Sequence, residues 1–229
     1  MTITLRPKKL AIFLTAFAFL LVLIHSIALA IYFYVDDPDV FDFVRLIDLD
    51  YEGNIPTLFS ALLFLSNGCL FYLLYRATKE NKQPYALYWL GLALVFTFLG
   101  FDEGTRLHEE IGDLTEHLVE AKGLLYFPWV IPYSIAFVIA VSVYFRFYLT
   151  LDRRLQLRLL ACAVVFLSGA VGLEIFSARE AETSGTSSLS YSILYTIEES
   201  LEMAGLILLF HTLTDKLRVE NDVITLKLR

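Results

Sequence analysis

Three glutamates, Glu198, Glu199 and Glu202, lie in an otherwise apolar stretch of the sequence, YTIEESLEMAG, at residues 195–205. A helix turns by about 100° per residue, so it places these glutamates and Tyr195 on one face, within an arc of about 100°. One carboxylate at the centre of a membrane helix costs about 2.5–3.5 kcal/mol, and three uncompensated ones approach about 10 kcal/mol. Such a face requires protonation, ion pairing or a bound cation.

Other apolar segments carry ionisable residues at a similar depth when each residue is given a rise of about 1.5 Å. These residues are His25 in the first segment, Asp102, Glu103, Arg106, His108 and Glu109 in FDEGTRLHEE, and Glu174 in VGLEIF. On a regular helix Asp102, Arg106 and Glu109 share a face. His108 joins that face only if the helix bends or unwinds, and Gly104 is a plausible place for this. We expect all these groups in one layer, in the outer half of the bilayer.

Acids outnumber bases in this layer, which favours one or two divalent cations. Helical bundles hold di-iron and di-manganese centres with carboxylates from several helices and a few histidines. Oxygen donors without a thiolate favour Fe or Mn over Mg or Ca, and make Zn less suitable. The predicted ligands are Asp102, Glu103, His108, Glu109, Glu174, Glu198, Glu199 and Glu202. A network neutralised by protons or by Arg106 remains the alternative, because the Glu-x-x-His pairs of di-iron bundles are missing from the sequence.

Some residues of this set could act in catalysis, either as a general base or by binding the group that the metal activates. The candidates are Glu199, Glu202 and Glu109. His25, Arg106 and Tyr195 are predicted to support the ligands by hydrogen bonds or by charge.

Six apolar segments must position these residues, each near the roughly 20 residues that a membrane helix needs. They run over about 10–35, 55–77, 86–101 with a helical extension to 120, 124–149, 155–177 and 191–213. The composition agrees: 57 % of the residues are hydrophobic, 19 % are charged, and the mean hydropathy is +0.63. We therefore expect an all-α polytopic membrane protein, a bundle of six transmembrane helices forming one domain over residues 1–229. The first apolar run, about 20 residues long, exceeds the ~7–15 of a signal peptide.

The basic residues predict the orientation, since Lys and Arg concentrate in cytoplasmic loops. Of the 18 Lys and Arg residues, the exceptions to an N-in, C-in arrangement are Arg45, Arg106, Lys122 and Arg179. Both termini, including a tail at 218–229, are then cytoplasmic. The sequence fits a multi-pass protein of a bacterial inner membrane or a thylakoid-type membrane.

The first connection is strongly acidic and lies on the outer side in this arrangement. It contains Asp36, Asp37, Asp39, Asp42, Asp48, Asp50 and Glu52 against Arg45 alone, in a chain of net charge −7. Such a surface attracts cations and argues against nucleic acid as a partner.

Four motifs carry a resemblance to a known group of proteins: NIPT at 54–57, DE-x4-HE at 102–109, GxE at 172–174 and EE-x2-EM at 198–203. In this combination the sequence resembles a family of bacterial and cyanobacterial multi-pass membrane proteins. The resemblance covers most of the chain from Asn54 onward. It implies that the motifs belong to one site, and it brings no activity with it.

Three functions fit these residues, and whether the chain is an enzyme stays open among them. The first is a metal-dependent oxidoreductase or hydrolase acting on a lipid-phase substrate. The second is a transporter of cations or protons that uses the same acids, although the inner half has few ionisable residues. The third is a non-catalytic subunit or assembly factor whose acids pair with a partner chain, in a membrane complex or a homo-oligomer.

Overall fold

Helices dominate the structure, a computed structural model that describes residues 2–4, 6–35, 44–119, 122–221 and 225–227. The helices are α1 (Pro7–Tyr34), α3 (Ile55–Glu80), α4 (Ala86–Thr105), α5 (Leu107–Glu116), α6 (Val130–Thr150), α7 (Arg153–Leu167), α8 (Glu174–Ser184) and α9 (Leu189–Asn221). A short 3₁₀ turn, η1 (Gly123–Leu125), precedes α6, and a π-helical turn, η2 (Ser168–Leu173), joins α7 to α8. Two short strands, β1 (Thr2–Thr4) and β2 (Thr225–Lys227), pair antiparallel with Ile3 opposite Leu226.

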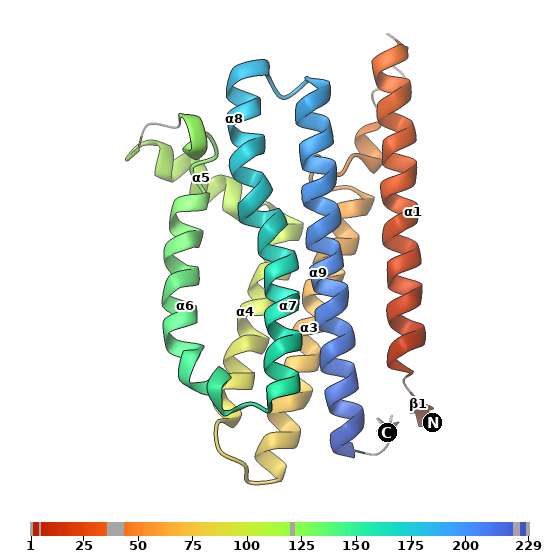
Figure 1. Cartoon of the computed structure of the whole chain (residues 1–229), viewed down its shortest axis with the longest axis vertical. Coiled ribbons are helices and arrows are strands. Elements are labelled where there is room, and N and C mark those ends of the chain that lie inside the picture. The colour runs from red at the N-terminus through yellow and green to blue at the C-terminus, as the bar shows by residue number, and fades with distance from the viewer. Residues whose placement is uncertain (1, 5, 36–43, 120–121, 222–224, 228–229) are drawn as a thin grey trace.

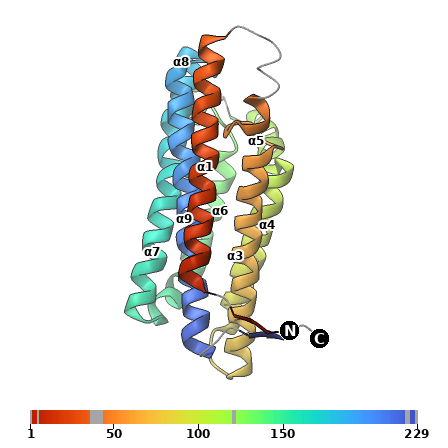
Figure 2. The same ribbon diagram turned by 90° about the vertical axis from the view of Figure 1, so that its right-hand side faces the viewer.

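The helices form an elongated bundle in which α9 packs against α1, α3, α7 and α8 (Figure 1). Helices α3 and α4 form a closely packed hairpin, and α1 and α6 lie at opposite edges of the view in Figure 1. Turned by 90°, the bundle shows α3 and α4 on one side and α7 on the other (Figure 2). Both chain termini lie at one end, which we call the terminal end. The opposite end, with residues 44–54 and the α8–α9 connection, is the distal end.

Local sequence signals set several helix boundaries. Asn54 is the N-cap of α3, and its side chain accepts a hydrogen bond from the Thr57 N–H (3.1 Å), with Pro56 in the first turn. Asp152 caps α7 in the same way through the Leu155 N–H (3.0 Å). Arg106 has a left-handed backbone (φ 59°) and separates α4 from α5. These boundaries decide where the polar side chains of the distal end point.

Close packing and interhelical hydrogen bonds hold the bundle together, since lipid tails are as apolar as the core side chains. Asn67, fully buried on α3, donates to the Leu63 carbonyl of its own helix (3.0 Å) and to the Leu206 carbonyl of α9 (3.1 Å). At Gly205 a Cβ atom would lie 2.7–2.8 Å from the Cβ and backbone of Phe166. The absence of a side chain at this position therefore lets α9 approach α7.

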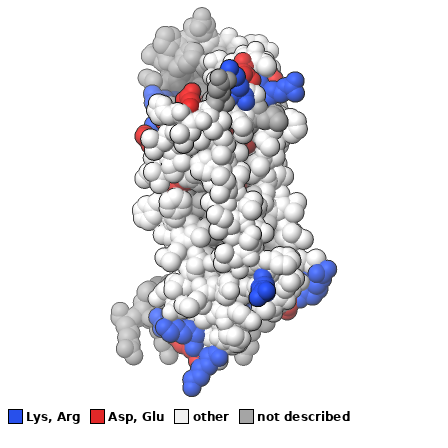
Figure 3. Space-filling view, turned by 90° about the vertical axis from the view of Figure 1, so that its left-hand side faces the viewer, with Lys and Arg blue, Asp and Glu red and all other residues white. Residues whose placement is uncertain are grey.

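Five helices are long and apolar enough to cross a membrane: Pro7–Tyr34, Ile55–Glu80, Ala86–Thr105, Val130–Thr150 and the continuous helical stretch Arg153–Ser184. Large apolar side chains are exposed along them, among them Phe13, Phe19, Leu87 and Val138. Charged side chains gather toward the two ends of the bundle and leave a largely uncharged band between them (Figure 3). The chain is thus an all-helical protein suited to a lipid bilayer. Its sixth span, α9, and its orientation stay predictions.

The helix boundaries differ from the sequence-based prediction at three places. The predicted 86–101 helix with its extension is divided at Arg106 into α4 and α5. The fourth span begins at Val130, because η1 and the residues around Pro128 form separate turns before it. Helix α9 continues to Asn221, past the start of the tail expected at 218–229, and β2 follows. The acidic residues at positions 36–43 and the tail residues 222–224 and 228–229 lie outside the described residues.

Candidate functional site

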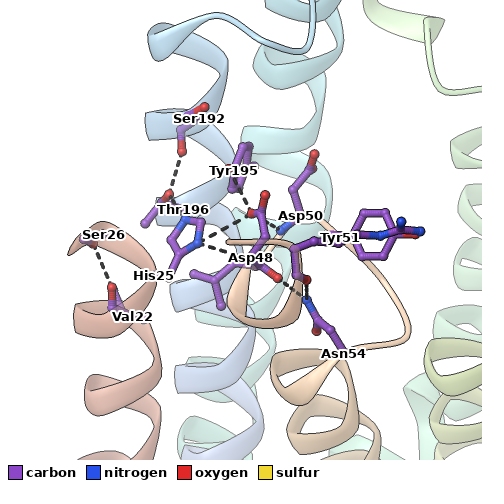
Figure 4. A network of polar contacts seen from close by, with 12 residues as sticks. Val22, His25, Ser26, Asp48, Asp50, Tyr51, Asn54, Ser192, Tyr195 and Thr196 are labelled. Atoms are coloured by element: carbon purple, nitrogen blue, oxygen red, sulfur yellow. Dashed lines mark hydrogen bonds and ion pairs between the residues drawn. The ribbon is translucent and has the colours of Figure 1, made fainter. Parts of the chain in front are cut away.

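Residues 44–54 fold back against the helices and bring acidic side chains to the distal end. Residues 44–47 form a helical turn, and Val44 and Ile47 are buried against Ala28 of α1. Asn54 holds the segment, because its Nδ2 donates to the carbonyls of Arg45 (3.0 Å) and Asp48 (Figure 4). The segment thereby places Asp48, Asp50 and Glu52 beside the helices.

His25 of α1 is fully buried and joins three parts of the chain. Its Nδ1 accepts a hydrogen bond from the Leu49 N–H (3.3 Å), so Nε2 carries the ring proton and faces Thr196 Oγ1 of α9 (3.0 Å). Asp48 Oδ1 lies 3.5 Å from Nδ1 (Figure 4). A proton added to this Nδ1 would therefore meet a carboxylate.

Two tyrosines of α9 reach the acids of segment 44–54. The Tyr195 hydroxyl donates to Asp48 Oδ1 (3.0 Å), and the Tyr191 hydroxyl donates to Asp50 Oδ1 (2.9 Å). Burial of the carboxyl group, reinforced by the charges of Asp48 and other nearby acids, raises the pKa of Asp50 to about 7, although the residue as a whole is exposed. Asp50 can therefore gain and lose a proton near neutral pH.

A second cluster surrounds His108, the first-turn histidine of α5. Because the chain reverses at Arg106, the His108 N–H donates to Asp102 Oδ1 (2.7 Å), and the ring Nδ1 lies 3.5 Å from the same oxygen. The other ring nitrogen, Nε2, contacts Glu52 Oε1 at 3.0 Å. Asp102 is buried and also accepts from the Tyr133 hydroxyl of α6 (2.7 Å). This cluster joins α4, α5, α6 and segment 44–54.

The charge state of His108 follows from these two partners. Burial by itself would lower the pKa of the imidazole, but hydrogen bonds to Asp102 and Glu52 and their negative charges outweigh it and raise the pKa of His108 to about 10. His108 is therefore an imidazolium between two carboxylates at neutral pH. It is the main positive charge within this cluster.

A third cluster lies between α8 and α9. Glu174 and Glu198 are both buried, at 8 % and 6 % exposure, and their carboxyl groups are close enough to interact directly. The Ser177 hydroxyl donates to Glu198 Oε2 (2.8 Å). The helices approach closely at Gly169, where a Cβ would lie 2.6 Å from the Glu198 carbonyl oxygen. Gly169 belongs to the π-helical turn η2, and such turns are frequent at functional sites.

Glu103, Glu199 and Glu202 lie between the second and third clusters. Glu202 is close enough to Glu103, Glu198 and His108 for their charges to interact, and Glu199 interacts in the same way with Glu202 and Glu103. The carboxyl groups of α4, α8 and α9 thus form one electrostatic group. Among the described residues, no set of three His, Cys, Asp or Glu side chains has the geometry of a metal site.

The structure brings most of the candidate residues to the distal half and leaves two, Arg106 and Glu109, exposed at its surface. Glu109 is exposed, and its Oε2 lies 3.5 Å from Arg106 Nη1. Arg106 also contacts Glu52 Oε2, at 3.8 Å from Nε. Both distances exceed those of a hydrogen bond. The unwinding considered at Gly104 occurs instead at Arg106, and it turns His108 back toward Asp102.

Several residues of the candidate site were not among the sequence-based candidates. They are Asp48, Asp50, Glu52, Tyr133, Ser177, Tyr191 and Thr196. The first three alternate with apolar or aromatic residues in DLDYEG, directly before the N-cap Asn54. That alternation is the signal that could have revealed acids folded inward. Tyr133 gives no such signal, because tyrosine at a membrane boundary usually lies in the aromatic belt.

The fold and the site together define a helical membrane protein with a buried polar centre in the distal half of its bundle. Over residues 11–217 the chain matches the family described as a domain of unknown function, DUF8692, and it belongs to this family. No curated protein and no solved structure matches the chain.

Proposed function

We propose that the distal half of the bundle is a proton-binding site, centred on Glu174 and Glu198, that takes up and releases protons at the distal side. The close approach of these two buried carboxyl groups carries this proposal. Two such groups share a proton, because two ionised carboxylates in a low-dielectric site repel each other. The Ser177 hydroxyl stabilises whichever charge remains on Glu198. The pair therefore holds one proton and one negative charge.

A route from the surface to the pair runs through Tyr191 and Asp50. The Tyr191 hydroxyl is hydrogen-bonded to Asp50, and both groups are close enough to Glu174 and Glu198 for their charges to interact. Asp50 is exposed and has a pKa near 7, so it exchanges protons with water. Intramembrane acids that are connected in this way are typical of proton relays. In this function, proton binding at the site would be coupled to the movement of a cation.

Infrared difference spectroscopy of the protein in lipid nanodiscs tests the proposal through the C=O stretch of a protonated carboxyl group. We expect this band at neutral pH in the wild type, and its loss in Glu198→Gln and in Glu174→Gln. Glu116→Gln, at the exposed end of α5, is the matched control and should leave the band unchanged. A wild-type protein with no such band would contradict the proposal. Proton flux into proteoliposomes then shows whether binding is coupled to transport.

Binding of a divalent metal ion is a second candidate, and one observation favours it. Glu103, Glu199 and Glu202 lie close enough together for their charges to interact, and the basic residue that interacts with this group, His108, is already paired with Asp102 and Glu52. The described side chains do not form a ready coordination geometry, so a metal would require them to rearrange. Fe or Mn remains the expected ion, and redox or hydrolytic chemistry on a lipid-phase substrate the expected use.

Elemental analysis of protein purified without chelators separates the two candidates. A metal site predicts stoichiometric Fe or Mn that is lost in the Glu199→Gln, Glu202→Gln double variant and kept in Glu116→Gln. Trace metal only, unchanged in the double variant, would exclude this second candidate. It would leave the proton-binding proposal standing.

A further inference from the structure

A hollow at the distal end borders the His108 cluster, with which it shares Glu52. It has a volume of about 430 Å³ and opens to the surface between segment 44–54 and the start of α5. Its lining residues are Arg45, Leu46, Tyr51, Glu52, Gly53, Asn54 and Arg106. Neither Arg45 nor Arg106 is needed by the proton-binding proposal.

The two arginines make this hollow unusual in an acidic protein. The chain has a net charge of −7, and the predicted outer connections contain only Arg45, Arg106, Lys122 and Arg179 as basic residues. Two of these four residues, Arg45 and Arg106, line this hollow. Among the residues that line the hollow, two are positively charged, Arg45 and Arg106, and one is negatively charged, Glu52. The hollow therefore attracts an anion.

The geometry of both guanidinium groups leaves donors for a ligand. Arg45 stacks on the Tyr51 ring, with its Cζ 4.1 Å from the ring centroid. Stacking fixes the guanidinium plane and leaves its in-plane N–H donors for other acceptors. Arg106 contacts Glu52 and Glu109 only at 3.8 and 3.5 Å, which is longer than a hydrogen bond. Arginine donors in a planar fork match the oxygens of a phosphate.

Helix α3 begins next to the hollow and adds to its potential. Its N-cap, Asn54, lines the hollow, so the positive end of a 26-residue helix faces this region. Glu52 Oε2, in contrast, is a buried acceptor without a hydrogen-bond partner among the described residues. A ligand that completes the site therefore carries an anionic phosphate for the arginines and an N–H or O–H donor for Glu52.

Apolar side chains continue from the hollow along the lipid-facing side of the bundle. Leu46 lines the hollow and is half exposed, and Ile55, Leu58 and Leu62 follow on one exposed face of α3 at helical spacing. A phosphate in the hollow would have its acyl chains beside this stripe. The position at the end of a membrane-spanning helix is the level of lipid headgroups.

We propose that the hollow between Arg45 and Arg106 binds the phosphate headgroup of a membrane lipid whose headgroup also carries a hydrogen-bond donor, with the acyl chains lying along α3. Phosphatidylglycerol and phosphatidylethanolamine have this chemistry. Phosphatidylcholine has the phosphate but no such donor. The lipid site goes beyond the proton-binding site and shares neither Glu174 nor Glu198 with it.

Native mass spectrometry of the full chain in detergent tests the proposal. Phosphatidylglycerol is titrated against phosphatidylcholine of the same acyl chains, and glycerol phosphate and inorganic phosphate serve as water-soluble probes. We expect phosphatidylglycerol to bind at least about tenfold more tightly than phosphatidylcholine, the ratio that one charged hydrogen bond supplies. The Arg45→Gln, Arg106→Gln double variant lacks the donors for the phosphate and should bind phosphatidylglycerol at least about tenfold more weakly, whereas Arg179→Gln, which does not line the hollow, should bind it as the wild type does.

Each of the following outcomes would overturn part or all of the proposal. Equal binding of the two lipids by the wild type, or unchanged binding of phosphatidylglycerol by the double variant, would refute the headgroup site. If glycerol phosphate or inorganic phosphate binds as tightly as the lipid, the anion site stands but its occupant is a soluble phosphate compound. The lipid-free melting temperature of each variant identifies loss of folding. The infrared test of Glu198 is unaffected by the double variant, so the two proposals fail separately.

Discussion

His108 shows how partners, more than burial, set the charge of a group at this site. The two carboxylates of Asp102 and Glu52 contact its two ring nitrogens. An imidazolium that bridges two acids also fixes the positions of α4, α5 and segment 44–54. The same residue that looks like a metal ligand in the sequence is engaged as an ion-pair partner in the fold.

The raised pKa of His108 predicts a pH dependence of stability. The pKa in the folded protein is about 10 and the unfolded value is about 6.5, so the stabilisation is complete below pH about 6.5 and is lost as the pH rises through about 10. We expect the melting temperature in detergent to fall over this interval. In His108→Gln the fall should be smaller, and the variant should be less stable at pH 6 by about 3–5 kcal/mol, the cost of breaking a buried ion pair.

His117, an exposed residue at the end of α5, provides the control. His117→Gln should reproduce the wild-type pH profile. A wild-type profile that is flat between pH 7 and pH 10 would contradict the assigned charge state of His108.

At the scale of elements, segment 44–54 and the π-helical turn η2 decide the geometry of the site. The segment is held by Asn54, which caps α3 and bonds two carbonyls of the segment at the same time. The turn η2 sets the direction of α8 and brings Gly169 against α9. Segment 44–54 lies outside the spans and η2 is a turn within one of them, and each aligns residues from different spans.

Replacing Asn54 by Ala should loosen segment 44–54 and weaken the start of α3. Loss of an N-cap costs about 0.5–2 kcal/mol, and the two carbonyl contacts add to this. Hydrogen exchange with mass spectrometry should show faster exchange in residues 44–60. Asn81→Ala, at the other end of α3, should leave exchange in this region unchanged.

Two glycines of η2 give a matched comparison of helix contact. A Cβ at Gly169 would lie 2.6 Å from the Glu198 carbonyl and 3.1 Å from Glu202 Cγ, whereas at Gly172 its nearest neighbour is the Leu167 carbonyl at 3.6 Å. Gly169→Ala should therefore destabilise the protein by about 1–3 kcal/mol, the cost of overpacking. Gly172→Ala should be close to neutral in the same thermal unfolding assay. Equal effects of the two substitutions would argue against the close α8–α9 approach.

The sequence predicts the spans well because a hydrocarbon solvent imposes one simple requirement, long apolar helices. The acids of α4, α8 and α9 could be placed in one layer from residue rise alone. Connections are harder, because nothing in helical periodicity states that Leu49 packs inward and carries Asp48 and Asp50 with it. The reversal at Arg106 was equally hidden, since a left-handed arginine has no sequence signature.

At the scale of the whole molecule, the chain termini lie together at one end (Figure 1). The polar centre lies toward the other end. The basic residues of the connections at the terminal end include Lys79, Lys82, Arg153 and Arg154. By the positive-inside rule this end is predicted to face the cytoplasm. The polar centre would then open to the opposite side of the membrane.

Reporter fusions test this orientation. Green fluorescent protein fused after Arg229 should fluoresce, because it folds in the cytoplasm, and alkaline phosphatase inserted at residues 185–188 should be active. Phosphatase inserted at residues 81–84, in the connection between α3 and α4, is the control and should be inactive. An active phosphatase at the C-terminus would reverse the predicted orientation.

The π-helical turn has a consequence for how this chain tolerates insertions and deletions. A turn of this kind has one more residue than a regular α-helix needs, so deleting one residue from 168–173 restores regular winding. Because the wide turn already absorbs the extra residue, α8 nearly keeps its phase relative to α7, and Glu174 and Ser177 stay on the face that meets Glu198. Deleting a residue from a regular part of α7 would instead rotate every later residue of the span by about 100° about the helix axis. The span should therefore tolerate a one-residue deletion at this turn better than one within α7.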